Sequence, residues 1–175
     1  MKISIVIPCF NEKNTISKII EKVKDEKNYE KEIIVIDDFS TDGTRELLKD
    51  KLNQEIDEVI YNDKNYGKGF SVKQGINKAS GDIILIQDAD LEYDPSDYFK
   101  LIEPIQKGYA DVVYGSRFVG SEEKRVLFFW HSLGNYILTT LSNMFSNLNL
   151  TDMENCYKVF KSDIIKNIDL IENRF

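Results

Sequence analysis

The sequence predicts an α/β fold with a mostly parallel sheet flanked by helices. Short apolar runs, typical of strands that are buried on both faces, recur along the chain. Segments with apolar residues at helical spacing lie between these runs, so that strands and helices alternate. This alternation predicts helices layered on a sheet. The expected strands are residues 3–7, 33–36, 59–61, 83–86 and 112–114, of which 59–61 has the weakest pattern.

Helices are expected after the first two strands and again before the last one. Apolar residues spaced by three and four predict helices at 16–23 and 47–52. Asp94 is a suitable N-cap and Pro95 a suitable first helical residue, so a third helix should begin there. We expect that helix to end near Gly108.

A longer apolar pattern with helical spacing covers residues 126–148. Its polar interruptions argue against a membrane-spanning helix, which needs about 20 mostly apolar residues. Because more than one side is apolar, two interpretations stay open. The helix packs between the sheet and a partner subunit of a homo-oligomer, or residues 124–148, which begin with a basic pair, make a peripheral membrane contact. His131 is expected on the helix surface or in packing and not as a catalytic base.

The composition is that of a single soluble domain covering residues 1–175. The hydrophobic content of 42% and the charged content of 30% are ordinary for a globular protein. A net charge of −7 argues against a nucleic-acid partner, which would require a basic face. Cys9 and Cys156 are far apart, which indicates a reducing compartment and no disulfide framework, and Cys9 is expected to be a small buried residue. With a strand at the very start, we expect a cytoplasmic protein, and the helical pattern that opens at Ser162 suggests a chain truncated at its C-terminus.

Two carboxylates follow the strand at 83–86. Alternate residues of an extended segment project the same way, so Asp88 and Asp90, with Ala89 between them, can converge on one point. Hard oxygen ligands of this kind suit Mg²⁺ or Mn²⁺ with a phosphate-bearing substrate. The alternative is that the carboxylates only cap the following turn.

Other acids are expected at the same edge of the sheet. In a parallel sheet, ligands bind outside the carboxyl ends of the strands, where Asn11 and Glu12 follow the first strand and Asp38 and Asp42 the second. Three acid-bearing loops at one edge would repel one another unless a cation or a donor-rich ligand lies among them. The sequence therefore favours a metal-nucleotide site.

Two basic residues are placed to meet phosphate at this edge. Lys68 lies between two glycines in a turn that opens a helix, a suitable place for an anion, although a plain turn is the simpler interpretation. Arg117 follows the strand at 112–114 and could neutralise phosphate oxygens by a bidentate contact.

Five short motifs follow one another in order over almost the whole chain: Pro8 with Asn11-Glu12, Asp37-Asp38 with Asp42-Gly43-Thr44, Gly67-Lys68-Gly69, Asp88-Ala89-Asp90, and Gly115-Ser116-Arg117. Together they resemble family 2 glycosyltransferases, which have the Rossmann-like GT-A fold. Within that family the chain is most similar to the dolichol- or polyprenyl-phosphate sugar synthases. Two departures are small, Phe10 where tyrosine is common and Glu92 where glutamine or serine often occurs.

The resemblance implies three sets of site residues. Asp38 and Asp42 would receive the base and ribose of a nucleotide-diphosphate sugar, a UDP- or GDP-hexose. The nucleotide-sugar-binding residues would be Pro8, Phe10, Asn11, Glu12, Asp38, Asp42, Lys68, Asp88 and Ala89; the metal ligands Asp88, Asp90 and Glu92; the catalytic residues Asp90, Arg117 and Asp152.

The function implied is inverting transfer of a hexose to a polyprenyl (dolichyl or undecaprenyl) phosphate at the inner face of a membrane. A lipid phosphate is largely anionic at neutral pH, since its second pKa is about 6, so it can attack without a strong base. One alternative is transfer to a glycan hydroxyl in cell-surface polysaccharide synthesis, with Asp152 as base; another is an inactive nucleotide-sugar-binding domain. A phosphoacceptor receiver domain fits poorly, because its acid pair should follow the first strand and a lysine the fifth.

Overall fold

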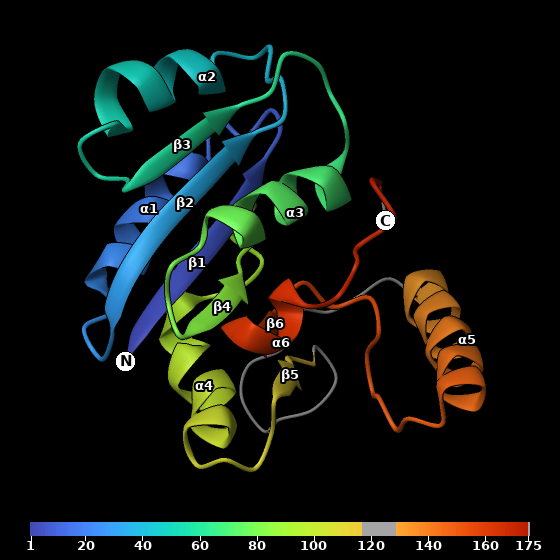
Figure 1. The fold of residues 1–175 in the computed structure, drawn as a ribbon. Coiled ribbons are helices and arrows are strands. Elements are labelled where there is room, and N and C mark those ends of the chain that lie inside the picture. Colours follow the sequence, from blue (N-terminus) through green and yellow to red (C-terminus); the bar gives the residue numbers. More distant parts are fainter. Residues whose placement is uncertain (117–128, 175) are drawn as a thin grey trace.

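The structure is a computed structural model that describes residues 1–116 and 129–174. Its centre is a six-stranded sheet with the order β3-β2-β1-β4-β6-β5 (Figure 1). The pairs among β1, β2, β3 and β4 are parallel, and β6 pairs antiparallel with both of its neighbours. The predicted mostly parallel sheet is confirmed. The strands are β1 (Lys2–Cys9), β2 (Glu30–Asp37), β3 (Glu58–Tyr61), β4 (Ile83–Ile86), β5 (Val112–Tyr114) and β6 (Lys158–Lys161).

Strand β6 was not predicted from the sequence. It has only two apolar residues, Val159 and Phe160, between two lysines. Both are buried, and they pack on opposite faces of the sheet. Because β6 inserts between β4 and β5, the last predicted strand lies at the edge of the sheet, one strand away from β4.

Helices cover both faces of the sheet (Figure 1). Residues of α1, η1 and α4 pack into the larger apolar cluster on one face, and α3 and α6 contribute to the cluster on the other face. The helices expected at 16–23 and 47–52 are confirmed. The second consists of α2 and the π-helical turn η1 that continues it. The helices are α1 (Ile16–Asp25), α2 (Thr44–Leu47), η1 (Leu48–Leu52), α3 (Lys68–Lys78), η2 (Pro95–Asp97), α4 (Tyr98–Gln106), α5 (Phe129–Ser146) and α6 (Ser162–Lys166).

Helix α3 lies unusually close to the sheet. A Cβ atom at Gly75 would be 2.3 Å from Cγ1 of Val6 and 2.8 Å from Cδ1 of Ile36. Only glycine therefore permits this approach. The close packing places the start of α3 beside the carboxyl ends of β1 and β2, where the candidate site lies.

The predicted boundaries of the third helical segment are also confirmed. The Asp94 side chain accepts a hydrogen bond from the backbone N–H of Ser96 at 3.0 Å, and Pro95 opens the 3₁₀ turn η2 that leads into α4. Gly108, with a φ of +72°, follows the end of α4. Cys9, expected to be buried, is 2% exposed.

Helix α5 is confirmed between residues 129 and 146, while 124–128 lie outside the described residues. It stands to the side of the sheet (Figure 1), and its orientation differs from the expectation. The side chains buried on this helix are polar, Asn135 and Thr139. Its large apolar side chains are exposed instead: Phe129, Trp130, Leu133, Tyr136, Ile137, Leu138, Leu141, Met144 and Phe145.

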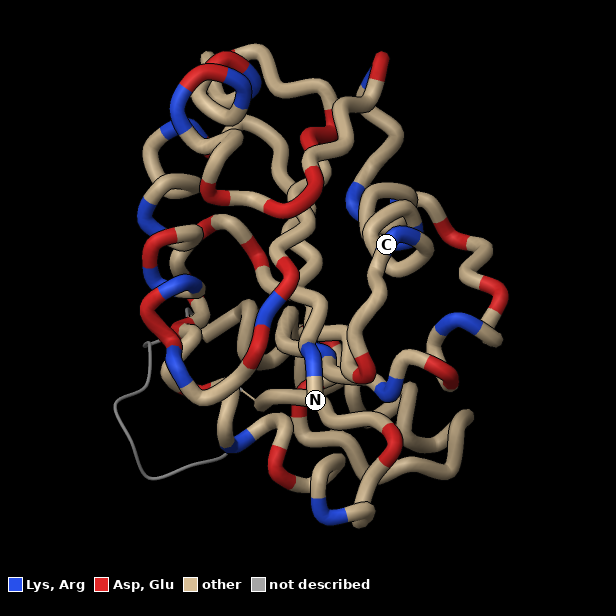
Figure 2. The backbone as a smooth tube through the Cα atoms, turned by 60° about the vertical axis from the view of Figure 1, so that its left-hand side comes forward, with Lys and Arg blue, Asp and Glu red and all other residues tan. Residues whose placement is uncertain are grey.

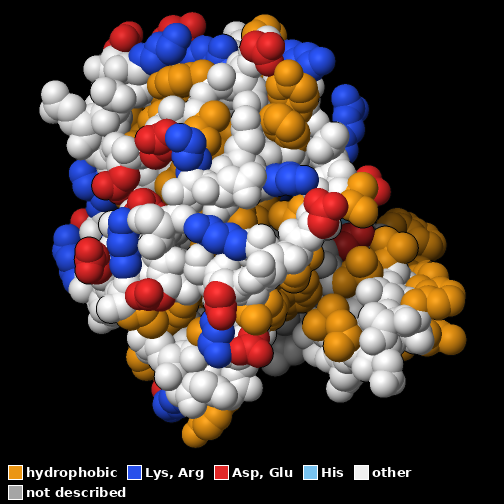
Figure 3. All heavy atoms as spheres, viewed as in Figure 1, with side chains coloured by type: hydrophobic (Ala, Val, Ile, Leu, Met, Phe, Trp, Pro, Cys, Tyr) orange, Lys and Arg blue, Asp and Glu red, His pale blue; other side chains and the backbone are white. Residues whose placement is uncertain are grey.

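These exposed side chains form an apolar face on α5, visible as orange spheres in Figure 3. The expected packing of its apolar residues on the sheet is therefore wrong. His131 is exposed on the helix surface, as predicted. Within the described parts of the chain, none of the helices has the length and apolar character required to cross a membrane. Elsewhere on the domain, acidic and basic residues are interspersed along the backbone (Figure 2).

Candidate functional site

The carboxyl ends of β1, β2 and β4 meet at one edge of the sheet, because the three strands are parallel neighbours. The loop after each of them contains a residue other than glycine with a positive φ: Asn11 at 58°, Phe39 at 68° and Leu91 at 64°. Such conformations are disfavoured and cluster at functional sites. The predicted location of the site at this edge agrees with this feature of the backbone.

The first two loops are held together by hydrogen bonds. The Asn11 N–H donates to Oγ of Ser40 at 2.9 Å, and the Glu12 N–H donates to Oγ1 of Thr44 at 3.0 Å. Asp42 accepts from the N–H of Thr44, the first residue of α2, at 3.0 Å. These three predicted binding residues thus shape the edge of the sheet.

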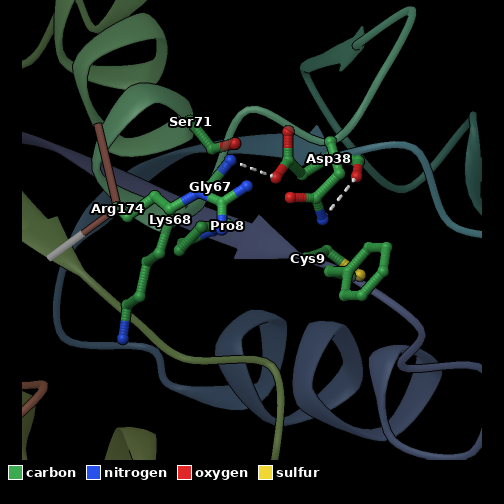
Figure 4. Close-up of a pocket in the computed structure, with 9 residues that line it drawn as sticks. Pro8, Cys9, Asp38, Gly67, Lys68, Ser71 and Arg174 are labelled. Carbon is green, nitrogen blue, oxygen red and sulfur yellow. Dashed lines mark hydrogen bonds between the residues drawn. The ribbon is translucent and has the colours of Figure 1, made fainter.

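A cavity of about 290 Å³ opens beside these loops (Figure 4). It brings together four residues that the sequence predicted for nucleotide-sugar binding: Pro8, Phe10, Asp38 and Lys68. Asn11, Glu12 and Asp42 lie next to it and are not among its lining residues. The further lining residues are Cys9, Asn65, Gly67, Ser71 and Arg174.

Asp38 is buried, and its carboxylate accepts hydrogen bonds from three donors. Its Oδ1 accepts from Nδ2 of Asn62 at 2.7 Å and from the N–H of Tyr66 at 3.0 Å. Its Oδ2 accepts from the N–H of Gly67 at 2.8 Å (Figure 4), where a φ of +101° favours glycine. The turn before α3 and Asn62 thus compensate the charge of Asp38, one of the acids expected at this edge.

The C-terminal segment folds back onto the start of α3 and adds Arg174 to the cavity. The N–H of Phe70 donates to the carbonyl of Asn173 at 2.9 Å, and a Cβ atom at Gly69 would be 2.5 Å from the carbonyl oxygen of Glu172. Figure 4 shows the Arg174 side chain reaching toward Gly67 and Pro8. Sequence reasoning missed this residue, because no local pattern indicates that the segment returns to α3.

Asp88, at the end of β4, forms an ion pair with Lys68. The Lys68 Nζ lies 2.6 Å from Oδ1 and 2.8 Å from Oδ2 of Asp88, and 3.5 Å from Sγ of Cys156. Burial lowers the pKa of Lys68, but the neighbouring Asp88 outweighs burial and the pKa is raised. Burial and the Asp88 charge raise the pKa of Cys156 to about 11, so this thiol is neutral at pH 7.

Asp90 is exposed on the same loop. Its Oδ1 accepts from the N–H of Glu92 at 3.0 Å. Desolvation raises the pKa of Asp90, and the negative charges of Asp88, Glu92 and Glu12 raise it further. A cation near Asp90 would relieve this repulsion.

The predicted metal ligands do not form a ready-made cage. Among residues 1–116 and 129–174, no group of three or more His, Cys, Asp or Glu side chains is arranged to hold a metal ion. Mg²⁺ is commonly bound by one or two carboxylates together with substrate phosphates. The hard oxygens of Asp88 and Asp90, with the repulsion at Asp90, fit such a partial site, which a bound diphosphate would complete.

A buried glutamine fixes the loop that carries these acids. Gln87 is fully buried, and its Oε1 accepts from the hydroxyls of Tyr98 and Tyr157, both at 2.9 Å. Its Nε2 donates to the carbonyl of Asp88 at 2.9 Å. The sequence contained a signal for this role, a polar residue at the end of an apolar strand, but Gln87 was not predicted as a site residue.

Asp152, predicted as a catalytic residue, is 2% exposed. Its Oδ1 accepts from Nδ2 of Asn135 on α5 at 2.9 Å. The next residue, Met153, donates its N–H to Oγ1 of Thr139, one turn further along α5. The segment that contains Asp152 is therefore attached to the polar side of α5. Arg117, the other predicted acceptor-side residue, lies outside the described residues.

The sheet order, the acid-bearing edge and the adjoining cavity define an α/β domain of the GT-A glycosyltransferase class. The chain belongs to glycosyl transferase family 2, whose family model matches residues 4–169. The predicted family and fold are thus confirmed.

Relatives with assigned functions are similar over about two thirds of the chain. Dolichol-phosphate mannosyltransferase of Pyrococcus furiosus is 36% identical over 122 residues, which are 68% of this chain and 34% of that protein. Undecaprenyl-phosphate 4-deoxy-4-formamido-L-arabinose transferase of Proteus mirabilis is 35% identical over 117 residues, 64% of this chain and 36% of that protein. The chain thus spans about a third of the length of these relatives.

Solved structures share the fold over nearly the whole chain. Glucosyl-3-phosphoglycerate synthase from Mycobacterium tuberculosis, in complex with Mn²⁺, UDP and phosphoglyceric acid, matches with a TM-score of 0.73 and 20% identity. The match covers 95% of this chain and 58% of that one. TarS of S. aureus, in complex with UDP-GlcNAc, matches with a TM-score of 0.62 and 20% identity over 95% of this chain and 47% of its own.

Proposed function

We propose that the protein transfers a hexose from a nucleotide-diphosphate sugar to a polyprenyl phosphate, with inversion at the anomeric carbon. The observation that carries the proposal is the position of Lys68, which lines the cavity with Asp38 and also contacts Asp88. A nucleotide in this cavity would have its diphosphate beside the acids that follow β4. The names of the two relatives, both transferases acting on a lipid phosphate, support the choice of acceptor.

The donor would be held by groups from three parts of the chain. Pro8, Phe10 and Asp38 would surround the nucleoside, with the Asp38 carboxylate shaping the turn that receives it. Lys68 and Arg174 would receive the diphosphate, since both are cationic and line the same cavity.

Asp88, Asp90 and Glu92 would hold Mg²⁺ or Mn²⁺. When bound, such an ion stabilises the negative charge that develops on the leaving diphosphate. The Mn²⁺ bound to glucosyl-3-phosphoglycerate synthase, which shares the fold, supports a divalent metal here. Gln87 would keep the loop in place while charge builds up, because its amide is bonded on both sides.

The acceptor phosphate would be attracted by Arg117 and would attack the anomeric carbon directly. It is anionic at neutral pH, so no strong base is required, and direct displacement gives inversion. Transfer to a glycan hydroxyl is the alternative, in which Asp152 would act as general base. The burial of Asp152 and its bond to Asn135 favour the phosphate acceptor, because a base must reach the proton that it removes. A nucleotide-sugar-binding domain without activity is the third possibility.

A lipid acceptor requires access to a membrane, and the apolar face of α5 is suited to provide it. Trp130 and Phe145 are 75% and 89% exposed on this face, a composition typical of helices that lie in a membrane interface. We propose that α5 contacts the inner face of a membrane. Burial of the same face in a homo-oligomer is the alternative, which the relatives' lipid-linked acceptors do not favour.

Calorimetric titration with UDP and with GDP, in the presence and absence of Mn²⁺, tests the donor site. We expect one of the two nucleotides to bind the wild type only in the presence of Mn²⁺. The Asp90→Ala variant should not show this Mn²⁺-dependent binding. If neither nucleotide binds in a metal-dependent way, the proposed function is wrong.

Transfer assays distinguish the acceptors. Wild-type protein and Asp152→Asn are compared with a polyprenyl phosphate and with a glycan acceptor. Transfer to the lipid phosphate that survives in Asp152→Asn supports the proposal. A loss confined to hydroxyl acceptors, without lipid-phosphate transfer in the wild type, supports the alternative.

A further inference from the structure

The ion pair between Lys68 and Asp88 occupies both oxygens of the first predicted metal ligand. The Lys68 Nζ is 2.6 Å from one oxygen and 2.8 Å from the other, so the ammonium bridges the carboxylate. The Asp88 side chain is 12% exposed and that of Lys68 is 33% exposed. A partly buried carboxylate needs a counter-charge, and Lys68 is the cation in contact with it here.

Lys68 is well placed to move between two partners. It is the first residue of α3, so its backbone is fixed, while four rotatable bonds carry its ammonium. Figure 4 shows the side chain extended away from Asp38 and Arg174, with its amine at the far end. A diphosphate in the cavity would lie within reach of the same side chain, because Lys68 also lines that cavity.

We propose that Lys68 is the resident counter-ion of Asp88, that a divalent cation competes with its ammonium for the same two oxygens, and that the displaced ammonium then binds the donor diphosphate. Each anionic group thus has a cationic partner. Asp88 is paired with Lys68 before the exchange and with the divalent cation after it, and the diphosphate is paired with the Lys68 ammonium. This inference rests on the proposed donor site.

The proposal makes metal binding and nucleotide binding respond in opposite directions to the loss of one side chain. When a metal ion binds alone, the displaced Lys68 ammonium loses its anionic partner. When a nucleotide diphosphate binds with the metal ion, the ammonium contacts the phosphate oxygens instead. Removal of the Lys68 charge should therefore strengthen the first kind of binding and weaken the second.

The experiment titrates wild-type protein and Lys68→Met with MnCl₂ alone, following free Mn²⁺ by electron paramagnetic resonance. We expect Lys68→Met to bind Mn²⁺ about tenfold more tightly than the wild type, since a competing charge at contact distance is removed. In saturating Mn²⁺, UDP or GDP should bind Lys68→Met about tenfold more weakly, because one phosphate contact is lost.

Lys158 offers a matched control. It lies in the same electrostatic neighbourhood, where Lys68 and Asp88 both influence its pKa, but its ammonium donates to the carbonyl of Asn155. Lys158→Met removes the same charge without removing a contact to Asp88. Its Mn²⁺ affinity should stay within about twofold of the wild type, since only the more distant field changes.

Equal or weaker Mn²⁺ binding by Lys68→Met overturns the inference, even if nucleotides bind as proposed. An equal gain in Lys158→Met also overturns it, because the effect would then be one of net charge. If Lys68→Met unfolds, Lys68→Gln replaces it. The metal-only titration contains no nucleotide, so failure of the proposed function, seen as absent UDP and GDP binding in the wild type, is a separate result.

Discussion

Asn135 and Asp152 join helix α5 to the acceptor-side segment by a hydrogen bond of 2.9 Å between two buried side chains. Asn143, two turns further along the helix, exchanges two hydrogen bonds with the backbone of Leu150, each at 2.8 Å. Helix α5 is thus attached to the domain mainly by polar contacts, on the side opposite its apolar face.

The first prediction concerns this attachment. Asn135→Ala removes the donor to a buried carboxylate, which should destabilise the docking of α5 by about 1–3 kcal/mol. Hydrogen–deuterium exchange in residues 129–146 should become faster. Thr140→Ala is the control, because Thr140 is exposed and its hydroxyl donates to the Tyr136 carbonyl of the same helix. Equal exchange in wild type and Asn135→Ala would contradict the prediction.

The second prediction concerns the network beneath the acids of β4. Gln87→Leu leaves the Tyr98 and Tyr157 hydroxyls without their acceptor and the Asp88 carbonyl without its donor. Because these groups are buried, we expect a loss of about 2–4 kcal/mol in the free energy of unfolding, measured in urea. Gln106→Leu, an exposed change at the end of α4, should cost less than about 0.5 kcal/mol. Similar losses in the two variants would show that the Gln87 hydrogen bonds do not contribute to the free energy of unfolding as proposed.

The third prediction concerns the pH dependence of stability and the side chain of Glu32, which lies in the amino-terminal half of β2. Burial raises the pKa of Glu32, but hydrogen bonds from Ser4, Ser80 and Lys2 outweigh burial and lower the pKa to about 2. Since the folded value lies below the ordinary 4.5, the stabilisation is complete above about pH 4.5 and is lost as the pH falls toward about 2.

Glu32→Gln should therefore reduce the free energy of unfolding by about 2–3 kcal/mol at pH 7 and by less at pH 3. Urea titrations at the two pH values measure the difference. Glu55→Gln is the control, because the Glu55 pair with Lys24 is exposed on both sides and should contribute less than about 1 kcal/mol at either pH. A deficit in Glu32→Gln that does not shrink at pH 3 would refute the assigned cause.

The fourth prediction concerns the apolar face of α5. The double substitution Trp130→Ser and Phe145→Ser should abolish flotation with vesicles that contain anionic lipids, because it removes two exposed aromatic anchors. The melting temperature should change by less than about 2 °C, since neither side chain is buried. Phe99→Ser, which alters a half-exposed aromatic residue on α4, should leave flotation unchanged. Unchanged flotation of the double variant would show that α5 is not the membrane contact, and absent flotation of the wild type would favour burial of this face in a homo-oligomer.

Much of the fold could be predicted because the strands are short, apolar and buried on both faces. Strand β6 escaped prediction, since two apolar residues between lysines carry too little pattern, and pairing with β4 and β5 decides their conformation. The periodicity of the sequence could not show which face of α5 packs against the domain. Its apolar residues outnumber the polar ones, but the hydrogen bonds that Asn135 and Asn143 make with residues 150 and 152 determine which side of the helix faces the domain.

The candidate site was predictable as a set of loops and less so as a set of contacts. The parallel order of the strands placed Pro8, Asp38 and Asp88 at one edge, as expected. The partners of each charge depend on long-range geometry. Lys68 pairs with an acid twenty residues away, and Arg174 reaches the cavity from the far end of the chain.

The positive φ values of Asn11, Phe39 and Leu91 have a consequence for affinity. Each conformation is disfavoured by about 1 kcal/mol or more and persists only because the surrounding contacts enforce it. A ligand that arrives at this edge of the sheet meets loops whose shape is already determined, and so loses little conformational entropy in ordering them. Substitution of Phe39 by glycine would relieve the backbone strain in the folded chain and increase the conformational freedom of this loop. A ligand would then lose more conformational entropy in ordering the loop, so its affinity would fall.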